Sequence, residues 1–111
     1  MTITIKTIIP SKLAENSQTT QYTATNVKTL IDKFTVLNTS ASPVTFNLNI
    51  VPLAGSASST NLFIKSKTIA VNETYSCPEI IGHVLEAGSF ISTIAGTASA
   101  LSICATGREI T

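Results

Sequence analysis

The segment Tyr75–Gly88, YSCPEIIGHVLEAG, gathers most of the reactive side chains of this chain. It holds the only histidine, His83, and one of the two cysteines, Cys77, together with the carboxylates of Glu79 and Glu86. A thiol, an imidazole and a carboxylate are the groups from which nucleophilic catalysis is built, and the same side chains can bind a metal ion. Any reactive site is therefore expected here first.

The spacing of these residues argues against both kinds of chemistry. A zinc site uses several His and Cys ligands at characteristic intervals, but this chain has one His and neither a CxxC nor an HxxxH pair. A catalytic triad needs a nucleophile, a base and an orienting acid, and nothing in the pattern brings Cys77 or Cys104 to His83. We predict that the segment has no catalytic residue, no metal and no cofactor, and that the chain is not an enzyme.

The same segment has the features of a structural corner. Pro78 fixes its own φ angle and ends the preceding strand, and Gly88 permits the left-handed backbone conformation that starts the next one. Between them, apolar residues recur at helical spacing, which predicts a turn or two of helix that closes one end of the fold. These residues are Ile80, Ile81, Val84 and Leu85.

The composition predicts that strands hold this corner. The chain of 111 residues is long enough for one domain. Charged residues make up only 12%, while 18 Thr and 13 Ser are present, and β-branched residues favour strands. A net charge of +1 without a basic run gives no field for nucleic acid. No apolar run is long enough to cross a membrane.

Alternation of apolar and polar residues divides the chain into seven or eight short strands, which predicts an all-β antiparallel β-sandwich, with the jelly roll as one form of it. Asp32 interrupts the alternation of its strand, so we expect a β-bulge there or a later strand start. Lys65 and Lys67 on one strand indicate a sheet edge. The predicted core consists of Phe34, Val36, Phe46, Leu48, Ile50, Leu62, Ile64, Leu101 and Ile103.

Residues 1–20 are predicted to be an N-terminal strand with a polar linker, separate from a sandwich domain of residues 21–111. A lone strand cannot satisfy its backbone hydrogen bonds, so this one must join a sheet. The polar stretch Pro10–Thr20 exceeds the usual connection and is long enough to reach a neighbouring subunit. We therefore interpret the strand as a candidate intersubunit interface. The alternative, that it is the first strand of its own sandwich, stays open. The candidate interface residues are Ile3, Ile5, Ile8 and Ile9.

The two cysteines are expected to be free. The N-terminus MTITIKTIIPSKL lacks the apolar core of a signal peptide, because Lys6 and alternating Thr interrupt it. Without export, the reducing cytosol keeps thiols reduced, so Cys77 and Cys104 are predicted to be unpaired.

Three segments carry a family resemblance: QYTATNVKTLIDKFTVLNTSASPVTFNLNIVP, ETYSCPEIIGHVLEAGSFIST and SICATGREIT. Together they resemble small structural proteins encoded among the virion genes of tailed bacteriophages. The resemblance implies a non-enzymatic capsid decoration (cement) subunit that stabilises the head shell. Its implied partners are copies of itself in a homotrimer and the major capsid protein, within a virion assembled in the host cytoplasm. The alternatives are a tail, neck or fibre-associated virion subunit and, further off, a receptor- or carbohydrate-binding β-sandwich.

Overall fold

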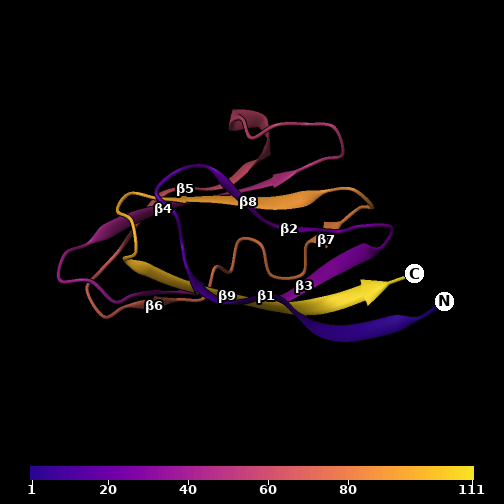
Figure 1. Cartoon of the computed structure of the whole chain (residues 1–111), viewed down its shortest axis with the longest axis horizontal. Coiled ribbons are helices and arrows are strands. Elements are labelled where there is room, and N and C mark those ends of the chain that lie inside the picture. The colour runs from indigo at the N-terminus through magenta and orange to yellow at the C-terminus, as the bar shows by residue number, and fades with distance from the viewer.

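The computed structural model describes all 111 residues and consists of two antiparallel sheets packed face to face (Figure 1). This confirms the predicted β-sandwich, although the structure has nine strands rather than seven or eight. The elements are β1 (Ile3–Leu13), β2 (Thr19–Thr23), β3 (Lys28–Asn38), β4 (Val44–Val51), the short 3₁₀ helix η1 (Ser59–Asn61), β5 (Leu62–Ile69), β6 (Thr74–Tyr75), β7 (Val84–Leu85), β8 (Phe90–Ala95) and β9 (Leu101–Ile110).

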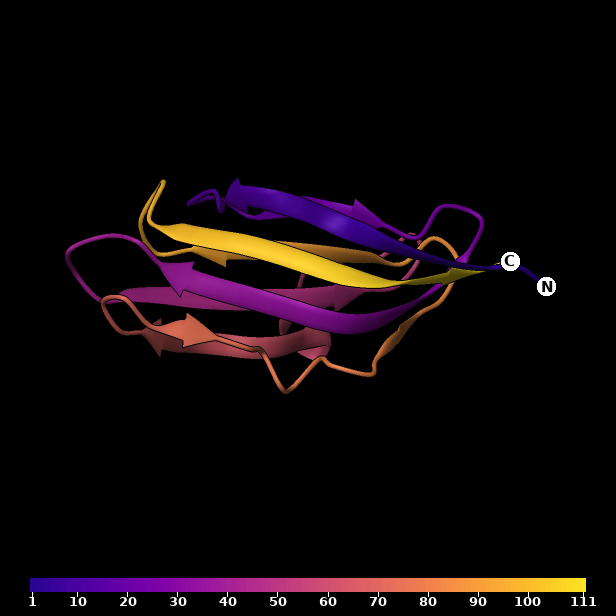
Figure 2. The ribbon, with the colours of Figure 1, turned by 90° about the horizontal axis from the view of Figure 1, so that it is seen from below.

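The strand order is that of a jelly roll. One sheet has the order β1-β9-β3-β6, which can be followed in Figure 2, and the other has the order β2-β8-β4-β5. The short strands β6 and β7 both run antiparallel to β3, at different places along it, so they are two pieces of one interrupted edge strand. When β6 and β7 are counted as one strand, β8 and β9 become the seventh and eighth strands. The two sheets then have the orders 1-8-3-6 and 2-7-4-5, which is a double Greek key.

The predicted bulge in β3 is present and decides which side chains enter the core. The pairing of β3 with β9 shifts between Ile31 and Lys33, so that Ile31 is buried before the shift and Phe34 after it. The bulge leaves Asp32 exposed, where its carboxylate accepts two hydrogen bonds from the Arg108 guanidinium, at 3.0 and 2.8 Å. Leu30 lies before the shift and is opposite Arg108, so it does not share the inner face of Phe34 and is half-buried.

The core lies between the two sheets and joins them through large side chains. Phe34 of one sheet and Phe46 of the other have ring centroids 6.3 Å apart. Two predicted core residues, Ile50 and Leu62, are only half-buried. The other predicted core residues are buried: Phe34, Val36, Phe46, Leu48, Ile64, Leu101 and Ile103.

The strand with the paired lysines is a sheet edge, as predicted. β5 is the last strand of its sheet, and both Lys65 and Lys67 are exposed. Ser66 between them has a φ of 49°, and the pairing with β4 shifts at this point. The charges and the irregularity make this edge unsuitable for pairing with another strand.

The prediction of a helical turn in the corner is wrong, because the segment Tyr75–Gly88 has no helix and forms turns and the short strand β7. The backbone of the corner forms isolated turns, with bonds from Ile80 to Cys77 and from His83 to Ile80, and it also bonds to β3. Ile31 donates its N–H to the carbonyl of His83 at 3.0 Å, and Gly82 donates to the carbonyl of Ile31 at 2.8 Å. Gly82 also has a φ of 88°, which a right-handed helix excludes. The corner therefore fills the gap in the interrupted edge strand.

The N-terminal strand pairs with its own domain. β1 lies antiparallel to β9 from the pair Ile3 and Ile110 to the pair Leu13 and Ser102, at the edge of the sheet. It continues through Pro10, which an edge strand tolerates because Pro10 lies in the register shift between Ile9 and Lys12 and has no partner on β9. The connection to β2 is thus only residues 14–18, a usual length. In this structure, β1 is the first strand of its own sandwich.

Candidate functional site

The carboxylates of the corner are directed to separate partners. Glu79 accepts a hydrogen bond from the hydroxyl of Tyr75, and Lys67 lies over the face of the Tyr75 ring, 5.0 Å from its centroid. Glu86 forms an exposed ion pair with Lys28 on β3, with 3.6 Å between the carboxylate and ammonium groups. These two carboxylates therefore support the surface packing of the corner rather than a common ligand.

The histidine and the cysteine of the corner also have separate structural roles. The His83 ring packs edge-on against Phe63 of β5, with ring centroids 4.7 Å apart, and so bridges the open side of the sandwich. Cys77 is fully buried, and its burial, followed by the charge of Glu79, raises the pKa of its thiol to about 12. A thiol with such a pKa is protonated at neutral pH and is a poor nucleophile and metal ligand.

The two thiols should differ sharply in reactivity. Both are free, and Cys104 is half-exposed where Cys77 is buried. We expect iodoacetamide at neutral pH to add one group to the native protein, at Cys104, and two groups to the denatured protein without reductant. Intact-mass measurement with peptide mapping checks this. Two adducts on the native protein would contradict the burial of Cys77, and none on the denatured chain would indicate a disulfide.

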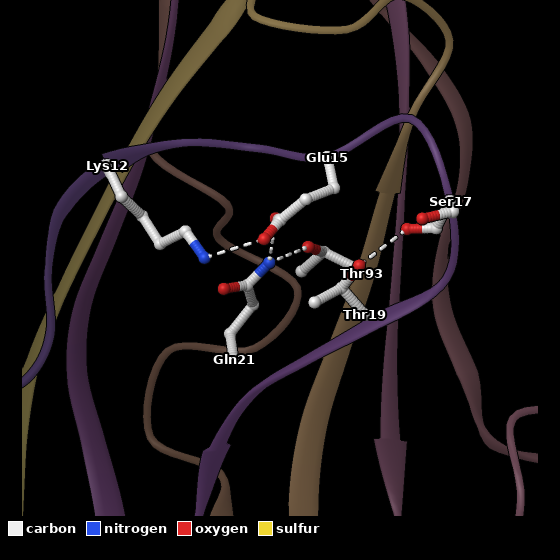
Figure 3. Close-up of polar contacts among 6 residues, drawn as sticks. All are labelled: Lys12, Glu15, Ser17, Thr19, Gln21 and Thr93. Atoms are coloured by element: carbon white, nitrogen blue, oxygen red, sulfur yellow. Dashed lines mark hydrogen bonds and ion pairs between the residues drawn. The ribbon is translucent and has the colours of Figure 1, made fainter.

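A polar cluster around Glu15 ties the connection between β1 and β2 to the opposite sheet (Figure 3). Lys12 donates to one carboxylate oxygen of Glu15 at 2.9 Å, and the side-chain amide of Gln21 donates to the other at 2.9 Å. The same amide nitrogen donates to the buried Thr93 hydroxyl at 3.0 Å. No sequence motif marks this cluster, because its members come from different elements.

The Glu15 cluster should make stability depend on acidity. The hydrogen bond from Lys12, followed by that from Gln21, lowers the pKa of Glu15 below its usual 4.5. A lowered pKa in the folded state means that the contribution of Glu15 is present above pH 4.5 and is lost as the pH falls through the lowered value. Because the side chain is 39% exposed, the contribution is at most about 1 kcal/mol.

We therefore expect the melting temperature of the wild type to fall more on acidification from neutral pH than that of Glu15→Gln. Calorimetry at a series of pH values from neutral to acidic measures the melting temperatures of both proteins. Glu86→Gln is the matched control, since Glu86 is 65% exposed and should behave as the wild type. Identical pH profiles for the wild type and Glu15→Gln would contradict the assignment.

A second polar cluster lies on the outer face of the β2-β8-β4-β5 sheet. The Gln18 amide donates to the Ser92 hydroxyl at 2.7 Å, and the Asn49 amide donates to the Asn61 carbonyl oxygen at 2.7 Å. Beside them is an open groove of about 290 Å³, which Asn47 also lines. Amide side chains can exchange hydrogen bonds with hydroxyl groups of a ligand.

A third polar cluster closes the end of the sandwich where both termini lie (Figure 1). The Tyr22 hydroxyl of β2 bonds to the buried Thr29 hydroxyl at 2.7 Å and donates to the carboxylate of Glu109 on β9. Lys6 of β1 lies 3.5 Å from the same carboxylate. Burial, followed by the bond to Glu109, raises the pKa of Tyr22 to about 12. The cluster binds both sheets and neutralises the charge of Lys6.

The structure divides the candidate interface residues into two pairs. Ile3 and Ile5 are 52% and 80% exposed, whereas Ile8 and Ile9 are 5% and 1% exposed and belong to the core. Ile8 faces inward by alternation with Ile3 and Ile5, and the register shift between Thr7 and Ile9 turns Ile9 to the same inner face. Only Ile3 and Ile5 are therefore available to another molecule.

Further apolar residues lie beside Ile3 and Ile5 on the outer face of the same sheet. Residues directly opposite on neighbouring strands share a face, and Ile5, Arg108, Leu30 and Val84 form such a row, while Ile3 is opposite Ile110. Val84 is 51% exposed. The outer apolar patch is defined as Ile3, Ile5, Leu30, Val84 and Ile110.

This patch and the amide groove are two surface features that could bind a partner. No three His, Cys, Asp or Glu side chains lie together in a way that could hold a metal ion. The structure has no helix with the length and hydropathy of a membrane span.

Comparisons with models of protein families, with curated proteins and with solved structures find no match to this chain.

Proposed function

We propose that this chain is a non-enzymatic structural protein of a bacteriophage virion, and specifically a capsid decoration (cement) subunit that stabilises the head shell. The observation that carries the proposal is the outer apolar patch on one sheet of a sandwich whose buried polar side chains are all hydrogen-bonded within the chain. Such a sandwich leaves no buried polar side chain unpaired and still exposes apolar side chains, as expected for a subunit that is completed by contact with others.

The resemblance noted in the sequence is consistent with this function. Its three segments coincide with the successive strands β2 to β4, with β6 to β8, and with β9. With a net charge of +1 and few charged residues, the surface suits polar and apolar contacts with protein, namely other copies of this chain and the major capsid protein. In this role the protein acts by binding to the assembled shell, and binding to the assembled state stabilises it by mass action.

Fractionation of purified particles tests the proposal. We expect the chain in the head fraction at a constant ratio to the major capsid protein, measured by quantitative mass spectrometry. Heads that lack the chain should open at a lower temperature, and adding the purified protein should restore their resistance. A chain confined to tail, neck or fibre fractions would support the alternative virion role, and its absence from particles would reject both.

A carbohydrate-binding sandwich is the second candidate, and the amide groove is the observation that favours it. Gln18, Asn47 and Asn49 line this groove with hydrogen-bonding side chains. Its lining contains no aromatic residue for a sugar ring to stack on, which ranks this candidate below the first. A glycan array tests it: retained glycans whose binding is lost in Asn47→Ala would support the candidate, and an empty array would exclude it.

A further inference from the structure

The edges of the two sheets are not equally protected against pairing with another strand. β5 has its lysines and its irregular backbone at Ser66, β2 has a register shift between Thr20 and Tyr22, and β6 and β7 have two residues each. In β1, Pro10 and two register shifts interrupt the second half. The first half, Ile3–Thr7, pairs regularly with β9 and lacks every one of these features except a single charge.

The hydrogen bonds between the two chain ends show which backbone N–H and C=O groups of Ile3–Thr7 are free. Thr2 and Thr111 exchange two backbone hydrogen bonds, at 3.4 and 3.0 Å. In an antiparallel ladder such pairs recur at every second residue, so the N–H and C=O groups of Thr4 and Lys6 also point to β9. The groups of Ile3, Ile5 and Thr7 consequently point away from β9, to the open edge of the sheet.

The side chains of this half do not oppose pairing. The one charged residue, Lys6, lies 3.5 Å from the carboxylate of Glu109, so its charge is already balanced within the chain. Ile3 and Ile5 are 52% and 80% exposed and belong to the outer apolar patch. An added strand would cover these two side chains and satisfy the free backbone groups beside them.

We propose that this edge binds a second copy of the chain, by antiparallel pairing of β1 with β1 about a two-fold axis at Thr4. In this register, Ile3 of each copy faces Ile5 of the other, and Met1 faces Thr7. The free N–H and C=O groups then meet each other, and the two β1-β9-β3-β6 sheets join into one. The two outer apolar patches become continuous on one face of that joined sheet.

Side-chain pairing distinguishes this register from those centred on Ile5 and on Lys6. A register centred on Lys6 places two lysines directly opposite each other, which is destabilising. A register centred on Ile5 gives one isoleucine pair and leaves Ile3 opposite Thr7, whereas the register at Thr4 gives two isoleucine pairs and places Lys6 opposite Thr2. A two-fold contact produces a dimer in place of the trimer expected from the family resemblance, and it does not depend on the virion function.

Charge placement at residues 3 and 5 tests both the contact and its register. The variant Ile3→Lys with Ile5→Glu puts opposite charges face to face in the Thr4 register, and Ile3→Glu with Ile5→Glu puts like charges there. Both variants carry Ile5→Glu opposite Arg108 of the same chain, so they differ only in the charge at residue 3. Sedimentation of the full chain over a range of concentrations should give a dimer for the wild type and for the opposite-charge variant. The like-charge variant should be a monomer, with a dissociation constant raised at least about tenfold.

Leu53→Glu is the control, because Leu53 is 71% exposed in a loop outside β1 and its variant should dimerise as the wild type does. A monomeric or trimeric wild type would overturn the proposal and leave the edge to a different protein. Equal behaviour of the two double variants would overturn it as well.

Amide hydrogen exchange of the wild type tests the contact without substitutions. On dilution, the amides of Ile3, Ile5 and Thr7 should lose protection, while those of Thr4 and Lys6 keep it. Protection that does not change with concentration at the first three amides would contradict the pairing.

Discussion

Replacing Leu48 with Ala is expected to lower the free energy of unfolding by about 2–5 kcal/mol. Leu48 is fully buried in β4, a central strand of its sheet, where it lies opposite Thr93 on one side and Ile64 on the other. Its side chain belongs to the core that joins both sheets, and the close-packed side chains around it can fill only part of the cavity that the substitution leaves.

Chemical denaturation of the wild type and of two matched variants measures this effect. Leu53→Ala removes the same atoms from a side chain that is 71% exposed, so its effect should stay within about 0.5 kcal/mol. A loss below about 1 kcal/mol for Leu48→Ala, or equal losses in the two variants, would contradict the placement of Leu48 in the core.

The second large effect is expected from Asn38→Asp, which changes one atom of a fully buried side chain at the end of β3. The Asn38 amide nitrogen donates to the carbonyls of Ser42 and Ile69, at 2.8 and 2.9 Å. Its carbonyl oxygen accepts from the N–H and the hydroxyl of Ser40, at 2.9 and 2.8 Å. Aspartate keeps the acceptors, removes both donors and places a negative charge against two carbonyls. The expected loss at neutral pH is about 3–5 kcal/mol.

Asn47→Asp is the matched control for this substitution. Asn47 is half-buried, and its side chain makes one hydrogen bond, in which its oxygen accepts from the N–H of Ser66. Aspartate preserves that bond, so the stability should change by no more than about 0.5 kcal/mol.

Burial raises the pKa of a carboxyl at position 38, and the loss in Asn38→Asp should therefore shrink on acidification, when the carboxyl takes up a proton. A loss that is independent of pH would mean that no buried charge is involved.

The sequence by itself predicted the features that depend on neighbouring residues of one strand. Alternation identified the all-β class and most of the core, because successive side chains of a strand point to opposite faces wherever the strand runs. The break at Asp32 predicted a bulge or a later strand start, of which the structure has the bulge, and Lys65 with Lys67 predicted that β5 is an edge. That the scattered His, Cys and Glu of the corner form no catalytic site stays a prediction from their spacing.

Only the tertiary structure decided the features that depend on which strands are neighbours. The pattern of Ile80 to Leu85 suits a helix, but β3 supplies backbone partners for this segment, and the helix does not form. The contacts of Asn38 and the cluster around Glu15 join residues from different elements, so no local pattern announces them. The same holds for the N-terminal strand: its isoleucines required a sheet, and the pairing of β1 with β9 decided that Ile8 and Ile9 are buried while Ile3 and Ile5 remain exposed. Backbone pairing is a choice among distant partners, and that choice is made when the two sheets close over a common core.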